Sequence, residues 1–175
     1  MLVTDRFARR RAYRALRRAH PEPGKTLASK ILFKMAWDRN PRLRIFADKV
    51  AVRNYIAERV GDAYVVPVLL EAEPGDEINF SLLPREYAIK VSHGSGGVIV
   101  VTDKADPHAS LPEDPRVGWV RFEIHPDQAD QARITALLTH WKSLNFEWWP
   151  GRNPEWAYRN VVPRVVVEPL LVSSN

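Results

Sequence analysis

The sequence predicts an α+β protein, and three observations support this fold class. Apolar residues recur at helical spacing through the first 60 residues. The pattern then changes to short β-branched runs bounded by turn residues, two of which flank a glycine-rich turn. A further amphipathic stretch of helical length follows Pro126. With 175 residues, 45% of them hydrophobic, the chain is long enough for one domain or two small lobes.

The N-terminal third predicts three helices, each with local signals at its ends. The second ends before Asn40-Pro41, since a residue that precedes proline disfavours the helical conformation. In the third, Asp48 is placed to cap the first turn and Gly61 suits the position after the last. The three predicted helices cover about residues 5–19, 26–37 and 49–60.

The remaining residues predict strands, one long helix and loops. A Pro- and Asp-rich surface loop is expected over 103–116, and a helix runs from Pro126 to about Lys142. A helical turn is expected over 154–159. The predicted strands are 64–70, 87–92, 97–102, 119–124 and 164–171.

The charge of the chain is concentrated at one end. Residues 1–60 carry 16 Lys and Arg against five Asp and Glu, whereas the whole chain has a net charge of +5. The Arg-rich first helix has three interpretations: a solvated face, attraction to anionic lipid headgroups, and nucleic-acid binding. The last has least support, because the chain lacks an aromatic RNA-binding signature and a clear recognition helix.

Composition excludes several kinds of site. There is no cysteine, so disulfides, thiolate nucleophiles and cysteine zinc sites are excluded. No apolar run approaches the about 20 residues that a membrane span needs. The five histidines are widely separated without metal-ligand spacing, and no Ser/His/Asp set stands out. We therefore predict no metal ligand and no catalytic residue from these patterns.

The glycine-rich turn is the first candidate site. Lys90 ends one predicted strand, and the run His93-Gly94-Ser95-Gly96-Gly97 leads into the next. Backbone N–H groups of such a loop can bind phosphate oxygens while the ammonium offsets their charge. The simpler interpretation is a surface lysine beside a tight turn. The loop is neither a Walker A motif nor a dinucleotide fingerprint, because a strand follows the glycines.

Two further segments have the same double interpretation. The helix start from Asp48 through Lys49 to Arg53 is explained by capping and solvated charges alone. Glu168 is explained as the polar end of an apolar strand, but its carboxylate could also accept a hydrogen bond from an adenine amino group. The aromatic pair Trp148-Trp149 is interpreted as packing residues, with a sugar platform as the alternative.

Taken in order, these segments resemble the nucleotide-binding half of ATP-grasp proteins, and specifically the TupA-like branch associated with teichuronopeptide biosynthesis. The resemblance spans about residues 40–171. The matching stretches are Asp48-Lys49, Val52-Arg53-Asn54-Tyr55-Ile56, Val60-Gly61 to Tyr64 and Pro67, Leu83-Pro84 to Ala88-Ile89-Lys90, His93-Gly94-Ser95-Gly96-Gly97, Asp103-Lys104, Glu155-Trp156 to Tyr158-Arg159, and Val162-Pro163-Arg164 to Glu168-Pro169-Leu170-Leu171.

The resemblance implies a fold and a ligand. It implies a basic helical region over 1–47, followed over 48–175 by an ATP-grasp nucleotide-binding lobe with a small antiparallel sheet and packed helices. The cofactor implied is ATP. The phosphates would contact Lys49 and Lys90 under a loop of His93, Gly94, Ser95, Gly96 and Gly97. Adenine would bind Glu168 and the backbone of Leu170 and Leu171, and we expect Ile89 and Val167 to line its slot.

The resemblance also implies a limit on catalysis. In the family, acidic and Asn ligands for Mg²⁺ follow the segment that matches Glu168, and the sequence ends at Asn175. We therefore expect that the metal-binding lobe is absent, and that a second chain would have to supply it. Whether the chain is an enzyme by itself is left undecided.

The function expected is that of the ATP-binding half of a carboxylate–amine ligase-type enzyme in bacterial surface-polysaccharide biosynthesis. The alternatives are a glycosyltransferase-associated protein of the same biosynthesis and a non-catalytic basic module that binds membrane or nucleic acid. The expected location is the cytoplasm, with peripheral attachment at the inner membrane face as an option.

Overall fold

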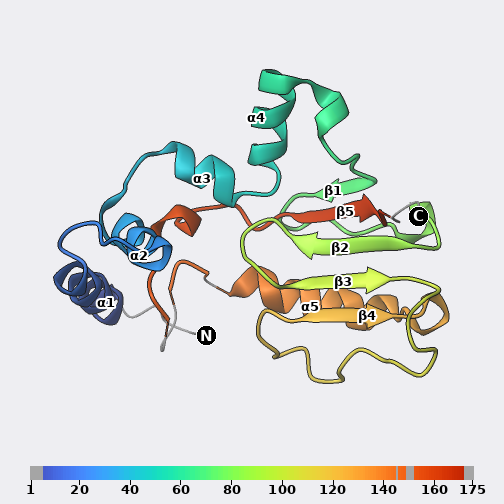
Figure 1. Ribbon diagram of the computed structural model, residues 1–175. Helices are drawn as coiled ribbons and strands as arrows, with labels where there is room; N and C mark the ends of the chain where they lie inside the picture. Colours follow the sequence, from blue (N-terminus) through green and yellow to red (C-terminus); the bar gives the residue numbers. More distant parts are fainter. Residues whose placement is uncertain (1–5, 145, 149–151, 172–175) are drawn as a thin grey trace.

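The computed structural model describes residues 6–144, 146–148 and 152–171. Its centre is a five-stranded sheet with the order β1-β5-β2-β3-β4 (Figure 1). The fold class is α+β, as the sequence predicts. The strands are β1 (Leu70–Ala72), β2 (Tyr87–Val91), β3 (Val98–Val101), β4 (Arg121–Ile124) and β5 (Val165–Pro169).

The sheet is mixed, which corrects the expected antiparallel sheet. β1, β5, β2 and β3 pair antiparallel in turn, and the glycine turn joins β2 to β3 as expected. β4, however, pairs parallel to β3, with Val98 opposite Arg121. The connection over 102–120 crosses back to the start of β3, and this return path permits a parallel neighbour where a tight hairpin would not.

One face of the sheet is covered by α5 (Gln131–Ser143), which lies along it in Figure 1. Four residues at helical spacing, Ile134, Leu137, Leu138 and Trp141, are at most 1% exposed and pack against the strands. Asp130 caps this helix by accepting hydrogen bonds from two backbone N–H groups. Pro126 begins a separate 3-10 turn, η3 (Pro126–Gln128), so the predicted long helix is two elements.

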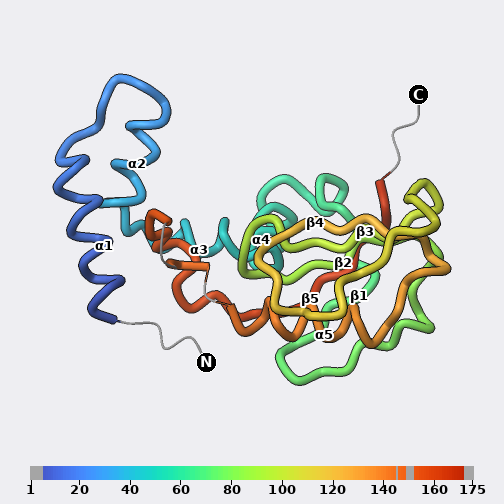
Figure 2. Tube along the Cα trace, turned by 90° about the horizontal axis from the view of Figure 1, so that it is seen from below, coloured from blue at the N-terminus to red at the C-terminus, as the bar shows by residue number. Residues whose placement is uncertain are grey.

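The basic N-terminal helices form a group at one end of the molecule (Figure 2). They are α1 (Arg6–Ala19), α2 (Leu27–Trp37) and α3 (Arg42–Ala47). The first two agree with the prediction, with Thr26 capping α2. The short α3 was not predicted, because Asn40-Pro41 was interpreted only as a helix end. It also begins a helix, since proline is tolerated in a first turn.

Residues from the C-terminal third pack against this helical group. The Glu147 carboxylate is 1% exposed and binds Arg9 of α1 and Arg159, the residue that follows η4 (Trp156–Tyr158). The guanidinium of Arg44 in α3 lies 4.5 Å from the centre of the Trp156 ring. The basic helices are therefore joined to the rest of the chain by buried contacts as well as by sequence.

The predicted strand over 64–70 is wrong in its extent. α4 (Ala51–Val60) ends at Gly61, which has a φ of 102°, and η1 (Asp62–Tyr64) follows. Residues 65–69 are irregular, and only Leu70 begins β1. The β-branched run suggests a strand, but Pro67 within it has no N–H for a sheet ladder. Another short 3-10 turn, η2 (Phe80–Leu82), lies in the segment between β1 and β2.

Among the residues that the structure describes, no helix is long and apolar enough to cross a bilayer.

Candidate functional site

The candidate site begins on the sheet face opposite α5. In the β2–β5 pair, Lys90 lies opposite Val166 and Ala88 opposite Glu168. Lys90 and Glu168 are therefore diagonal neighbours on one face, within reach of a long side chain. Lys90 Nζ lies 2.5 Å from Glu168 Oε2, and both side chains are mostly buried. The two residues that the sequence assigned to phosphate and adenine thus meet in an ion pair.

Arg53 completes a three-residue ion cluster with Lys90 and Glu168. It projects from α4, and its Nη1 lies 3.3 Å from Glu168 Oε1. Its Nη2 also donates to the carbonyl of Val66. One carboxylate oxygen therefore faces each cation, so Glu168 is held from two sides. Arg53 had no predicted role in binding, because only the tertiary structure brings α4 beside the end of β5.

Lys49 reaches the site through a short pairing between distant segments. Asp48 and His93 form an isolated antiparallel bridge, and the backbone N–H of Lys49 donates to the Ser92 carbonyl at 3.1 Å. The Lys49 ammonium donates to the carbonyl of Gly94. The chain just before α4 is therefore fixed to the first residues of the glycine loop, which brings Lys49 beside that loop.

Two lysines share this region of the site. Burial and, to a smaller extent, the positive charge of Lys90 lower the pKa of Lys49 to about 8, while Asp48 and Glu168 oppose the shift. An anion placed beside both lysines would relieve their repulsion and favour the protonated form of Lys49. This arrangement suits a phosphate group better than it suits a neutral ligand.

Ser92, which the sequence analysis did not single out, holds the loop's starting point. Its side chain is fully buried and donates to the Val162 carbonyl at 2.6 Å. Its oxygen also accepts from the backbone N–H of Arg164 at 3.0 Å. Arg164 in turn lies 3.5 Å from Asp48. These bonds fix the end of β2 to the chain that enters β5, and a lone serine gives no sequence signal of such a role.

The glycines of the loop have a packing requirement of their own. A Cβ on Gly94 would lie 2.5 Å from the Trp119 ring, and one on Gly97 would lie 2.8 Å from it. Gly96 has a φ of 95°, in the region that favours glycine. Ser95 and Gly96 are exposed at the tip of the loop. Trp119 therefore explains why glycine is needed at 94 and 97, independently of any ligand.

His93 directs its ring away from the lysines. Its Nε2 lies 3.0 Å from the carbonyl of Leu144 at the end of α5, and the ring makes an edge contact with Trp119. Burial lowers the pKa of the imidazole, so the neutral form is favoured. The structure thus places the His93 side chain in the packing beneath the loop, and its predicted phosphate contact stays a prediction.

The expected walls of the adenine slot are on the wrong face. Ile89 and Val167 do pair, as the proposed strand alignment requires, but both are fully buried against α5. Side chains alternate along a strand, so they point away from Lys90 and Glu168. The apolar neighbours on the Lys90 face are Ala88 and Val166 instead. Leu170 and Leu171 follow β5 directly, and Leu171 is 70% exposed.

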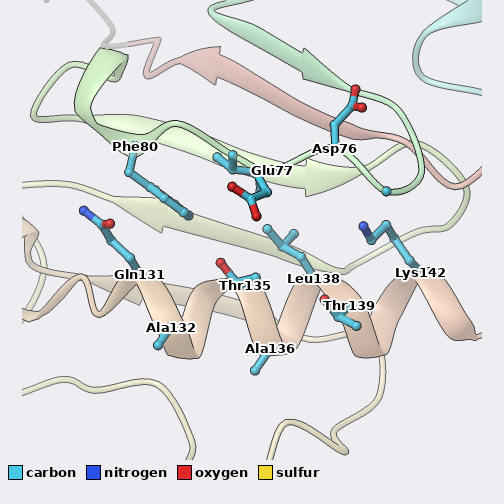
Figure 3. A pocket seen from close by; sticks show the side chains of 12 residues that line it. Asp76, Glu77, Phe80, Gln131, Ala132, Thr135, Ala136, Leu138, Thr139 and Lys142 are labelled. Carbon is cyan, nitrogen blue, oxygen red and sulfur yellow. The ribbon is translucent and has the colours of Figure 1, made fainter.

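A large surface hollow lies apart from this site. It has a volume of about 850 Å³ and lies between the loop after β1 and one face of α5 (Figure 3). Asp76 and Phe80 line one side of it, and Thr135 and Lys142 line the other. None of the predicted site residues lines it. Within the described residues, no group of three or more His, Asp or Glu side chains could hold a metal ion.

Comparison with known families finds a similarity to ATP-grasp proteins over part of the chain. The family model described as TupA-like ATPgrasp matches residues 29–108. This match agrees with the TupA-like ATP-grasp resemblance that the sequence carries. It includes Lys49, Lys90 and the glycine loop, whereas Glu168 lies outside it. The chain has no significant match to a curated protein or to a solved structure.

Proposed function

We propose that this chain binds ATP on the Lys90 face of the sheet, with the phosphates at Lys49, Lys90 and the backbone of residues 93–97. Adenine would lie toward Glu168 and the backbone of Leu170 and Leu171, against Ala88 and Val166 rather than against Ile89 and Val167. The match of residues 29–108 to the TupA-like ATP-grasp family model supports a nucleotide as the ligand.

One observation supports the phosphate position above all. Lys49 and Lys90 come from segments 41 residues apart in the sequence, yet the charge of Lys90 is the second-largest cause of the lowered pKa of Lys49. Folding has placed two ammonium groups in one partly desolvated region, and the Glu168 carboxylate that pairs with Lys90 leaves a net positive charge that a further anion would offset. A polyphosphate is an anion of the required charge.

The ion cluster gives Glu168 a defined part in binding. Its carboxylate neutralises Lys90 in the ligand-free arrangement, so an arriving phosphate competes with it for the ammonium. Arg53 remains on the other oxygen and keeps Glu168 from becoming an unpaired buried charge. Transfer of Lys90 from carboxylate to phosphate would also leave one Glu168 oxygen available to an adenine amino group.

The further expectations for this protein rest on the resemblance. We propose the ATP-binding half of a carboxylate–amine ligase-type enzyme of bacterial surface-polysaccharide biosynthesis. When bound, ATP would supply the phosphoryl group that activates a carboxylate in such chemistry. Acidic ligands for Mg²⁺ would come from outside the described residues, so a second lobe or a second chain is part of the proposal.

Titration calorimetry with ADP and a non-hydrolysable ATP analogue tests the site. Lys90→Ala should weaken binding about tenfold or more, because it removes a charge-assisted phosphate contact. Lys30→Ala is the matched control, since Lys30 is exposed on α2, and it should leave binding unchanged. Circular dichroism checks that both variants fold. Equal affinities for the wild type and Lys90→Ala would overturn the proposal.

A further inference from the structure

We propose that the helical N-terminal group contains a second anion site, a hollow that binds a phosphate group and is separate from the nucleotide site. The hollow has a volume of about 330 Å³. We call it the arginine hollow, and its lining residues are Arg10, Tyr13, Arg14, Arg17, Arg39 and Arg159.

Three segments of the chain build the arginine hollow. Arg10, Arg14 and Arg17 share one face of α1, because residues three and four apart are neighbours on a helix. Arg39 comes from the connection between α2 and α3, and Arg159 from the residue after η4. The guanidinium groups of Arg39 and Arg159 lie 5.2 Å and 5.9 Å from the centre of the Tyr13 ring, which lines the same hollow.

Most of this positive charge has no carboxylate partner among the described residues. Glu147 forms ion pairs with Arg159, which lines the arginine hollow, and with Arg9, which does not. Arg17 and Arg39 both donate to the carbonyl of Ala36, which fixes their positions but does not cancel their charge. Arg10 and Arg14 are exposed and have no ion pair with a described residue.

The electrostatics of the hollow favour an anion. Burial lowers the pKa of Arg39, and the charges of Arg17 and Arg159 act in the same direction, while Tyr13 and Asp38 oppose the shift. The folded chain therefore holds cations together against their repulsion, and two of them are locked by backbone hydrogen bonds. Planar guanidinium groups bind phosphate oxygens in pairs, so a phosphate or diphosphate is the ligand chemistry that fits.

This phosphate could belong to a soluble molecule or to a lipid headgroup. Arg11 and Arg18 are exposed on the same helix but do not line the arginine hollow. They extend the positive surface and would assist at an anionic bilayer, where each basic residue contributes about 1 kcal/mol. These two residues also supply a control of identical charge.

The test compares two double variants of the full chain. Inorganic pyrophosphate binding is measured by calorimetry at low salt. Arg10→Gln/Arg14→Gln should weaken binding about tenfold, whereas Arg11→Gln/Arg18→Gln, with the same net charge, should change it less than about twofold. Lys90→Ala should leave this binding in place, because the nucleotide site is a different one. The nucleotide proposal can therefore fail without this one, and the reverse also holds.

Vesicles then separate the two sources of phosphate. The wild type is mixed with vesicles of phosphatidic acid and phosphatidylcholine and sedimented. If Arg10→Gln/Arg14→Gln loses co-sedimentation and the control keeps it, the ligand of the arginine hollow is a lipid headgroup. Pyrophosphate binding without vesicle binding assigns a soluble ligand. Equal losses in both double variants would show diffuse attraction and overturn the site, as would pyrophosphate binding that disappears in Lys90→Ala. Binding of an RNA oligonucleotide that both variants weaken equally would also contradict it.

Discussion

Lys90 Nζ lies 2.5 Å from Glu168 Oε2 across the β2–β5 pair, and Arg53 binds the other oxygen of the same carboxylate. The three side chains are 15–22% exposed, so each depends on the others for neutralisation. This cluster links α4 to the centre of the sheet. It also pairs Lys90, the residue predicted to bind phosphate, with Glu168, the residue predicted to bind adenine.

Removal of the Glu168 carboxylate should destabilise the fold. Glu168→Ala leaves two partly buried cations without a partner, and the expected loss is about 2 kcal/mol of unfolding free energy. Glu168→Gln keeps the shape and one acceptor oxygen, so its loss should be smaller. Urea unfolding measures both. If both variants unfolded at the wild-type urea concentration, Lys90 and Arg53 would be solvated well enough by water not to need the carboxylate.

Nucleotide binding should take up a proton near pH 8. Burial, helped by Lys90, lowers the pKa of Lys49 to about 8, so about half of the lysine is neutral at that pH. A bound phosphate favours the charged ammonium and raises this pKa, so binding takes up part of a proton. The affinity should therefore fall as the pH rises through 8.

Calorimetry in two buffers with different ionisation enthalpies measures this proton uptake directly. Lys49→Met should abolish it, whereas Lys30→Ala should preserve it. A binding enthalpy that does not depend on the buffer in the wild type would place the phosphates away from Lys49.

The packing of Trp119 predicts that Gly94→Ala is damaging. The new Cβ would lie 2.5 Å from the ring, and such overpacking costs about 1–3 kcal/mol. Gly118→Ala is the matched control, since a Cβ there meets no atom within 4 Å. Thermal unfolding compares the two. An unaffected Gly94→Ala protein would show that the loop can move from Trp119 without cost.

The Glu147 carboxylate should be a main support of the helical group. It is 1% exposed and bound by Arg9, Arg159 and Tyr13, so Glu147→Gln should lose about 3 kcal/mol of stability. Glu155→Gln tests the same segment at a more exposed pair with Arg152, and its loss should be under about 1 kcal/mol. Similar losses for both would mean that the Glu147 cluster is not specifically stabilising.

Local signals in the sequence predicted much of the fold. A helix begins after Thr26, Gly61 stands at a helix end, and the glycine run joins two strands as expected, whereas the helix expected from Pro126 begins only after Asp130. The prediction failed where local signals compete. Pro67 interrupts a β-branched run that otherwise favours a strand, and Asn40-Pro41 ends one helix and begins another. The direction of β4 depends on the path of a long loop, which no local pattern encodes.

The sequence by itself determined the fold class, the candidate lysines and the similarity of residues 29–108 to the TupA-like ATP-grasp family, because these depend on neighbouring residues and on the order of motifs. Only the tertiary structure decided that Ile89 and Val167 face α5, that His93 turns beneath the loop, and that Arg53 joins Lys90 at Glu168. These outcomes depend on strand register and on contacts between residues as far apart as 115 positions. Such contacts depend on which faces of the helices and strands are buried together, and this is determined by the packing of the whole chain rather than by any local segment.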